Sequence, residues 1–400
     1  MKHFKKLLSI ILIASLVLSL SACTTETPSN TETDTTEETD APETEGTEEE
    51  VETETDTEGF ELALITDVGT IDDKSFNQGA WEGVEAYAKE FNITYKYYKP
   101  TEKSDSAYIN SIDLAVKAGA KVVVCPGFLF EVPIHTVQTQ YPDVKFVILD
   151  GAPHSGDYNI DIAPNTYSIF YAEEEAGFLA GYSIVKEGYT KLGFMGGMAV
   201  PAVVRFGYGF VQGADYAAKE LGLTDDIQVK YTYVGNFDAS PENQAKASSW
   251  YNEGTEVIFA CGGAVGNSVM KAAETAGTNV IGVDVDQSEE SDTVITSSMK
   301  NLSKSVYDAL ADYYADSFPG GTSVTLDATV EGVQLPMNTS RFEKFAQDDY
   351  DSIYEKVVAK EIEILNDTDV AAIAEAEDIP AEEVTAANIP TEQVTVEVIQ

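Results

Sequence analysis

The chain has 400 residues and carries 69 acidic but only 24 basic side chains, giving a formal net charge of −45. Such a charge argues against nucleic acid as a partner and against direct binding to anionic lipid headgroups, because both are negatively charged themselves. Three cysteines and three histidines without zinc spacing indicate neither a zinc site nor a disulfide framework. We therefore expect no metal and no cofactor. Cys125 and Cys261 each end an apolar run and are predicted to be core residues.

The N-terminus has the parts of an export signal. A lysine-rich start precedes an apolar run over residues 7–20, which is too short to be a membrane span. The following Leu20-Ser21-Ala22-Cys23 resembles the lipobox of bacterial lipoproteins, in which the cysteine is acylated, for example with palmitate. We expect residues 1–22 to be a signal peptide and Cys23 to hold the protein on the extracytoplasmic face of the cell membrane. The alternative is a secretory signal with an incidental cysteine.

Two acidic segments lie outside the globular part of the chain. Residues 24–58 hold 15 acidic and no basic residues, which is typical of an extended, disordered segment, so we predict that residues 23–58 form a tether. The C-terminal tail, residues 363–400, also lacks basic residues but has spaced Ile, Val and Ala. We expect residues 366–400 to be removable with little change in stability or ligand affinity. The spaced apolar residues leave docking on the rest of the protein as the alternative.

Between these segments, short β-branched runs alternate with amphipathic helical stretches. In chain order we expect strands at 62–65, 93–98, 121–125, 144–149, 191–195, 229–234, 256–260 and 280–283. Helices are expected at 72–90, 107–118, 129–141, 169–185, 203–221, 241–252 and 266–276. This alternation predicts an α/β protein with two doubly wound lobes, whose parallel sheets are covered by helices on both faces. Ligands of such sheets bind beyond the carboxyl ends of the strands.

The loops at those strand ends are rich in residues suited to binding a small polar ligand. They comprise residues 66–79, 125–127, 150–151, 196–197, 235–238, 262–267 and 284–287. Glycines allow a ligand to approach the backbone, carboxylates and an amide accept hydroxyl or amine protons, and phenylalanines stack on flat rings.

Residues 67–78, 262–267 and 281–287 closely resemble the basic membrane protein family. Its members are substrate-binding lipoproteins of ABC transporters, and one branch is the purine nucleoside receptor type, PnrA. The resemblance covers nearly all of residues 60–362. It implies a type I periplasmic-binding-protein fold, in which two lobes joined by three hinge strands close over a ligand. We expect the first lobe to comprise residues 59–162 and 292–318, and the second residues 163–291 and 319–362.

The resemblance implies that Phe76 stacks on a purine base. Phe237 also follows a strand and is our first choice for the opposite face of the base. Phe206 is the other candidate, but its helical spacing with Phe210 favours a role in packing. Asn77 and Asp150 are candidates for the base edge. The alternatives are a helix-turn hydrogen bond for Asn77 and capping of the next turn for Asp150.

Asp67, Asp284 and Lys300 are candidates for the ribose hydroxyls, because carboxylates accept protons from vicinal diols. Lys300 is expected to pair with Asp284, and its alternative is a surface salt bridge. Gly262 would let the backbone touch the sugar.

The predicted function is that of a solute-binding protein, not an enzyme. Neither a nucleophile–base pair nor a G-x-S-x-G elbow occurs. We expect a monomer that captures purine nucleosides and delivers them to ABC permease subunits. The alternatives are a lipoprotein for another small solute, and a surface receptor or adhesin without a transport role.

Overall fold

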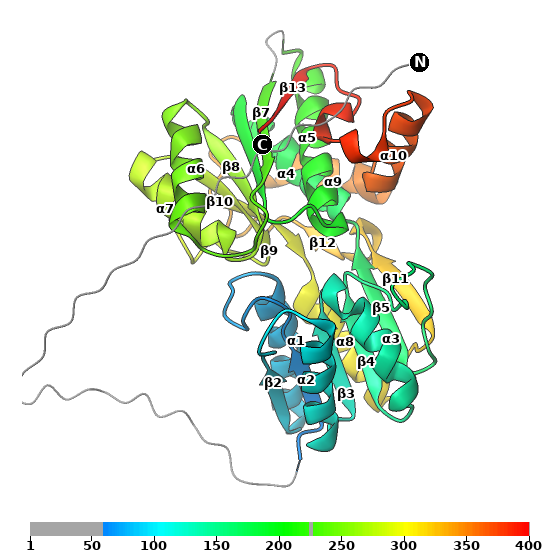
Figure 1. Ribbon diagram of the computed structural model, residues 1–400. Coiled ribbons are helices and arrows are strands. Elements are labelled where there is room, and N and C mark those ends of the chain that lie inside the picture. The colour runs from blue at the N-terminus through cyan, green and yellow to red at the C-terminus, as the bar shows by residue number, and fades with distance from the viewer. Residues whose placement is uncertain (1–58, 224–226, 400) are drawn as a thin grey trace, which may run out of the picture. The chain divides into compact units, whose positions relative to one another are not determined.

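The computed structural model describes residues 59–223 and 227–399. The predicted signal peptide, Cys23 and the tether lie outside the described residues. Within these two ranges the chain forms two sheets, each covered by helices on both faces, as the sequence predicts (Figure 1). No helix in this part of the chain combines the length and the apolar character needed to cross a bilayer.

The first sheet has six parallel strands in the order β11-β5-β4-β3-β1-β2. Its strands are β1 Leu62–Ile65, β2 Tyr95–Tyr98, β3 Val122–Pro126, β4 Lys145–Leu149, β5 Thr166–Tyr171 and β11 Thr322–Leu326. Its helices are α1 Phe76–Phe91, α2 Asp105–Lys117, α3 Glu131–Gln140 and α8 Leu302–Tyr314, with a short 3₁₀ turn η1 Phe128–Phe130 before α3. Residues at alternate positions of the strands pack against α1 and α8 on one face and α2 and α3 on the other.

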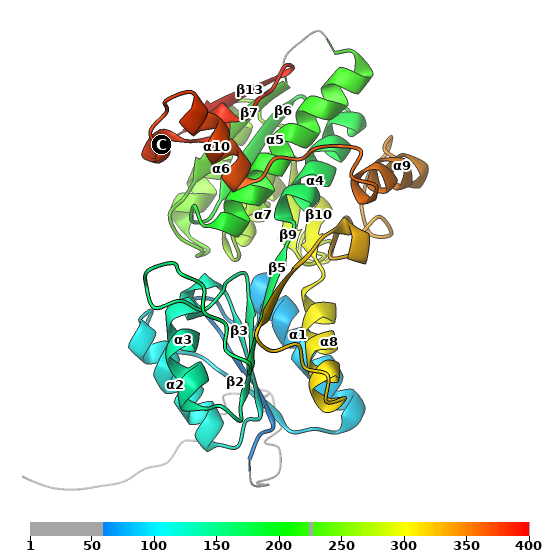
Figure 2. The same ribbon diagram turned by 90° about the vertical axis from the view of Figure 1, so that its right-hand side faces the viewer.

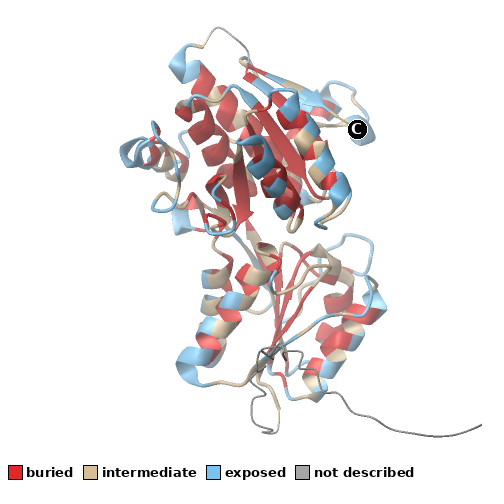
Figure 3. Cartoon of the chain, turned by 90° about the vertical axis from the view of Figure 1, so that its left-hand side faces the viewer, coloured by how far each residue is buried: buried red, intermediate tan, exposed pale blue. Residues whose placement is uncertain are grey.

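The second sheet has seven strands in the order β12-β10-β9-β8-β6-β7-β13, parallel except for the pair of β10 and β12. Its strands are β6 Lys191–Gly196, β7 Ile227–Tyr233, β8 Val257–Cys261, β9 Asn279–Asp284, β10 Val294–Lys300, β12 Val333–Gln334 and β13 Val394–Val398. Its helices are α4 Glu173–Glu187, α5 Pro201–Leu221, α6 Pro241–Asn252, α7 Val265–Ala276, α9 Gln347–Val358 and α10 Asp367–Ala376, with short turns η2 Ala328–Val330, η3 Ala381–Glu383 and η4 Ala386–Asn388. The central strands of both sheets are buried between helices that expose their outer faces (Figure 3).

The chain passes between the lobes three times, after β5, β10 and β11. Each crossing lies later than the sequence suggests. In the first sheet β5 pairs with β4 and β11 pairs with β5, and in the second sheet β10 pairs with β9. The first lobe therefore comprises residues 59–171 and 301–326, and the second residues 172–300 and 327–399, which corrects the predicted breaks at 162, 291 and 318. The start of the helix expected at residue 169 is also wrong. Residues 166–171 are β-branched or aromatic at most positions and form a strand, and α4 begins at Glu173.

The C-terminal segment, defined here as residues 363–399, docks on the second lobe (Figure 2). Its last strand, β13, pairs in parallel with the edge strand β7. Val370, Ala374 and Ile389 are buried. The structure therefore favours the alternative of a docked tail over the predicted dispensable one. Cys125 and Cys261 are buried free thiols, as predicted.

Candidate functional site

A cavity of about 410 Å³ lies where the carboxyl ends of strands from both lobes meet. All of the residues selected from the sequence line it: Asp67, Phe76, Asn77, Asp150, Phe206, Phe237, Gly262, Asp284 and Lys300. Convergence of the strand ends explains this, because in parallel sheets the loops after successive strands emerge at the same edge. The volume is typical of a site for a small organic molecule.

The first wall of the cavity is the loop between β1 and α1, which is held in shape by its own carboxylates. Asp67 Oδ1 accepts hydrogen bonds from the Gly69 N–H and from Asn77 Nδ2, both at 2.9 Å. Asp73 accepts the backbone N–H groups of Ser75, Asn77 and Gln78. Burial raises the pKa of Asp67 and Asp73 above the usual value, although these hydrogen bonds stabilise the charged forms.

Within this loop the Asn77 amide has partners of its own. Its nitrogen donates to Asp67 and Asp73, and its Oδ1 accepts the Asp67 N–H at 3.3 Å. Both amide hydrogens are thus used inside the loop. This geometry favours the alternative reading of Asn77 as a residue that fixes the turn.

Three phenylalanines line the cavity in different ways. Phe76 is the first residue of α1 and is partly exposed. Phe237 follows β7 and packs so closely on Gly197 that a Cβ there would lie 2.5 Å from its ring atoms. Phe206 is only 1% exposed and makes an edge contact with Phe259, so it belongs mainly to the core of the second lobe.

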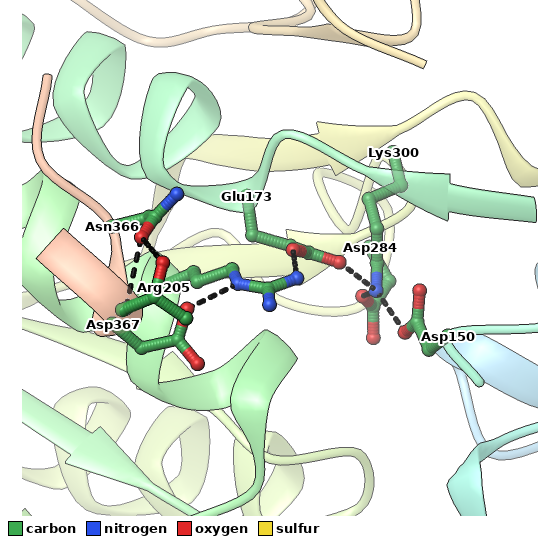
Figure 4. A network of polar contacts seen from close by, with 8 residues as sticks. Asp150, Glu173, Arg205, Asp284, Lys300, Asn366 and Asp367 are labelled. Atoms are coloured by element: carbon green, nitrogen blue, oxygen red, sulfur yellow. Dashed lines mark hydrogen bonds and ion pairs between the residues drawn. The ribbon is translucent and has the colours of Figure 1, made fainter. Parts of the chain in front are cut away.

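Lys300, the last residue of β10, is the central charge of the site (Figure 4). Its Nζ lies 2.5 Å from Asp150 Oδ2, 3.3 Å from Glu173 Oε1 and 3.8 Å from Asp284 Oδ1. The same nitrogen lies 4.7 Å from the centre of the Phe76 ring. Lys300 is 3% exposed, so the alternative of a surface salt bridge is wrong, and the predicted pairing with Asp284 is the longest of three contacts.

Burial and ion pairing have opposite effects on the groups around Lys300. Although burial alone favours the neutral amine, Asp150, Glu173 and Asp284 raise the pKa of Lys300 above its usual value. Burial raises the pKa of Asp284 to about 6, while Lys300 and the Ser75 hydroxyl oppose the rise. That hydroxyl belongs to the first lobe and donates to Asp284 Oδ2 at 2.5 Å, which links the two walls of the cavity.

Asp150 and Asp284 occupy matching places in the two lobes. Asp150 directly follows β4, Asp284 is the last residue of β9, and each has a positive φ, 53° for Asp150 and 67° for Asp284. Such backbone costs about 1–3 kcal/mol for a residue other than glycine and is concentrated at functional sites. Among the described residues, Asp150 Oδ1 is buried without a hydrogen-bond partner although Asp150 lines the cavity. A hydrogen-bond donor of a ligand that reaches this oxygen would satisfy it.

Glu173 is the functional residue that sequence reasoning missed. It opens α4 as the first of three consecutive glutamates and is 1% exposed. Burial raises its pKa to about 8, while Lys300 lowers it and Asp150 raises it. The signal in the sequence was an acidic run at the start of an otherwise apolar helix, where the helix dipole favours carboxylates.

The two described histidines belong elsewhere. His135 pairs with Asp161 at 3.4 Å and His154 with Glu131 at 3.1 Å, and neither histidine lines the cavity. In the part of the chain that the structure describes, no group of three or more His, Cys, Asp or Glu residues could hold a metal ion.

Comparison with known proteins gives a consistent result. Residues 60–368 match the family model of the PnrA-like substrate-binding proteins of ABC transporters. The chain is 31% identical over 307 residues to the ABC transporter nucleoside-binding protein BmpA of Lactococcus lactis subsp. cremoris, with 71% of this chain and 83% of that protein covered. It is 30% identical over 311 residues to basic membrane protein B of Borreliella burgdorferi, with 76% and 86% covered.

A solved structure confirms the fold. The crystal structure of a solute-binding protein of an ABC transporter system from Aeropyrum pernix K1 has a TM-score of 0.67 with this chain at 23% identity, and the match covers 80% of this chain and 97% of that one. The predicted architecture of two α/β lobes is thus confirmed. The matched family model and the two relatives show that the chain belongs to the PnrA-like family of ABC transporter substrate-binding proteins.

Proposed function

We propose that this chain captures purine nucleosides in the cavity between its lobes and delivers them to an ABC permease. The observation that carries the proposal is the pairing of two accessible aromatic rings, Phe76 and Phe237, with a buried cluster of hydrogen-bonding charges around Lys300. A nucleoside has the same two parts, a flat base and a polar sugar. A relative bearing the words "nucleoside-binding" in its name supports this choice.

In this proposal Phe76 and Phe237 lie on the two faces of the base. Base–aromatic stacking contributes ~1–3 kcal/mol per base in nucleic-acid complexes, so two rings could supply a large part of the affinity. The free Oδ1 of Asp150 suits an N–H or O–H donor of the ligand. Asn77 contributes mainly by fixing Asp67, because its own donors are engaged within the loop.

The ribose hydroxyls would donate to Asp67 and Asp284, with Lys300 compensating the negative charge. Gly262 lines the same part of the cavity, where a Cβ would lie 2.7 Å from the Gly197 nitrogen, so only glycine fits there. A free base lacks the ribose hydroxyls, so it would give these carboxylates fewer hydrogen bonds than a nucleoside and should bind more weakly.

The balance of charge argues against nucleotides as ligands. Two basic residues, Lys99 and Lys300, line the cavity. They face six aspartates: Asp67, Asp72, Asp73, Asp150, Asp238 and Asp284. A phosphate placed among these carboxylates would be repelled.

Three further parts of the proposal concern the protein's setting. Cys23 would carry the lipid anchor that keeps the protein at the extracytoplasmic face of the membrane, next to its permease. The protein would act as a monomer. It would bind its ligand without catalysing a reaction. The competing candidates are another small solute and a surface receptor without a transport role. Deletion that abolishes nucleoside uptake would support transport, whereas loss of attachment alone would support a receptor.

The ligand is tested directly in two steps. Protein purified under native conditions is denatured, and any released small molecule is identified by mass spectrometry. Refolded, ligand-free protein is then titrated by calorimetry with guanosine, adenosine, adenine and AMP. We expect nucleosides to bind more tightly than adenine and AMP. Equal affinity for adenosine and AMP, or binding of a sugar or amino acid instead, would refute the assignment.

A further inference from the structure

The C-terminal segment contacts the second lobe along one face of α5. Arg205, Gln212 and Asp215 are seven and three residues apart, which places them on the same side of the helix. Each makes a polar contact with the segment. Arg205 Nε donates to Asp367 Oδ1 at 2.7 Å, and the Gln212 amide exchanges hydrogen bonds of 2.7 and 2.8 Å with the Leu365 backbone. Asp215 Oδ1 accepts the N–H groups of Glu392 and Gln393 at 2.8 and 2.6 Å. The segment is thus fixed to a helix whose N-terminal turn lines the cavity.

Arg205 joins this segment to the buried ions of the site (Figure 4). Its NH1 lies 3.7 Å from Glu173 Oε2, on the side of the guanidinium away from Asp367. The other oxygen of Glu173 lies 3.3 Å from Lys300 Nζ. Four groups that are alternately acidic and basic therefore connect the surface of α10 to the lysine of the cavity: Asp367, Arg205, Glu173 and Lys300.

The helices that carry Arg205 and Glu173 are packed too closely to move independently. A Cβ on Gly177 of α4 would lie 2.1 Å from the Phe206 carbonyl oxygen, and one on Gly209 of α5 would lie 1.9 Å from the Glu174 carbonyl oxygen. The two backbones are therefore in direct contact, and the position of Arg205 along α5 fixes its distance from the start of α4.

We infer that the C-terminal segment positions the lysine of the binding site. Asp367 orients the Arg205 guanidinium, Arg205 holds the Glu173 carboxylate, and Glu173 holds Lys300 toward the cavity. Arg205, Glu173 and Asp367 do not line the cavity and are positioning residues. The inference rests on the proposed nucleoside function for its affinity test.

The charge on Glu173 offers a test with a defined sign. Burial raises its pKa to about 8, and the groups that face it are Lys300, Asp150, Arg205, Glu174, Tyr171 and Cys261. If Asp367 were only a nearby negative charge, its removal would lower this pKa, because repulsion would decrease. If Asp367 orients Arg205, its removal lets the guanidinium turn to water, and the pKa of Glu173 rises.

The affinity test compares Asp367→Asn with a matched control, Glu392→Gln. Glu392 also belongs to the C-terminal segment and also pairs with a basic residue of α5, Lys219, at 3.0 Å. We expect Asp367→Asn to weaken adenosine binding by roughly 2- to 30-fold, the range of mutations that act through a coupled network. Glu392→Gln should stay within twofold of the wild type, and Asp367→Glu should restore part of the affinity.

A double-mutant cycle adds a second criterion. Once Arg205→Gln has broken the chain, adding Asp367→Asn should cause no further loss of adenosine affinity. Additive losses, or equal affinities for Asp367→Asn and Glu392→Gln, would overturn the inference.

The Glu173 carboxyl is titrated by ¹³C NMR in ligand-free protein. A midpoint that rises in Asp367→Asn supports the inference, and an unchanged or lower midpoint contradicts it. This titration needs no ligand. If the wild type binds no nucleoside, the proposed function fails, but the titration still decides whether the segment acts on Glu173.

Discussion

Phe76→Ala tests the proposed binding mode most directly. If the ring stacks on a base, its loss removes ~1–3 kcal/mol of binding free energy. At 1.4 kcal/mol per factor of ten, this corresponds to a dissociation constant raised roughly 5- to 150-fold. The ring also lies 4.7 Å from Lys300 Nζ, a cation–π contact that contributes about 0.5–2 kcal/mol. That contact exists without ligand, so its loss lowers the stability of the ligand-free protein rather than the affinity.

The two effects are separated by measuring adenosine affinity by calorimetry and ligand-free stability by chemical denaturation. Phe76→Leu keeps the apolar side chain without the flat ring and should lose most of the affinity as well. Phe91→Ala is the control, because Phe91 lies on the same helix, is 53% exposed and contacts only Tyr87 among aromatic rings of the described residues. Adenosine binding by Phe76→Ala within twofold of the wild type would refute base stacking at this position.

Lys300→Met leaves the acidic groups of Asp150, Glu173 and Asp284 without their cation and should destabilise the protein by about 3–5 kcal/mol. An unfolding free energy within about 1 kcal/mol of the wild type would contradict this role of Lys300. Glu173→Gln should change the pH dependence of the unfolding free energy. With its raised pKa of about 8, the Glu173 carboxyl keeps in the native state a proton that the unfolded chain loses near pH 4.5. The contribution of this group to wild-type stability therefore falls as the pH rises from 4.5 to 8. The stability of the Gln variant relative to the wild type should thus increase over this interval, and a constant difference would be the contrary result. Removal of residues 366–400 exposes the apolar surface under the docked segment, which costs about 1.5–3 kcal/mol of unfolding free energy for each large buried side chain. The melting temperature should therefore fall by several degrees. An unchanged melting temperature would show that docking adds no stability. Cys23→Ser should release a soluble protein with unchanged nucleoside affinity, whereas retention in the membrane fraction would disprove the lipid anchor.

Much of the fold follows from local patterns in the sequence. The runs around residues 62–65 and 257–261 are apolar at every position, as expected for central parallel strands, and both are buried strands in the structure. The strand at Thr166–Tyr171 is harder to recognise, because its last three residues are apolar or aromatic and lead, after one residue, into a largely apolar helix. Pairing with β4 and β11, which is a long-range property, decides its identity.

The members of the site were predictable, but their connections were not. The residues lie in loops after strands, and the parallel topology alone brings such loops together. Which carboxylate pairs with Lys300 depends instead on where the folded chain places each side chain, which local patterns do not determine. Asp150 is the nearest partner at 2.5 Å, and Glu173, which the sequence places at the start of a helix, is closer than the predicted Asp284.

Burial in this site has two opposite consequences that the structure reconciles. Removing Lys300, Asp150, Glu173 and Asp284 from water costs free energy, so the cluster is a weak source of stability for the fold. The same removal from water strengthens every hydrogen bond made inside the cavity, because competing solvent is absent. An incompletely satisfied oxygen such as Asp150 Oδ1 is therefore unfavourable in the empty protein, and a donor on the ligand would relieve that cost on binding. A ligand without such a donor would gain less, and this difference gives the cavity a physical basis for selecting polar ligands.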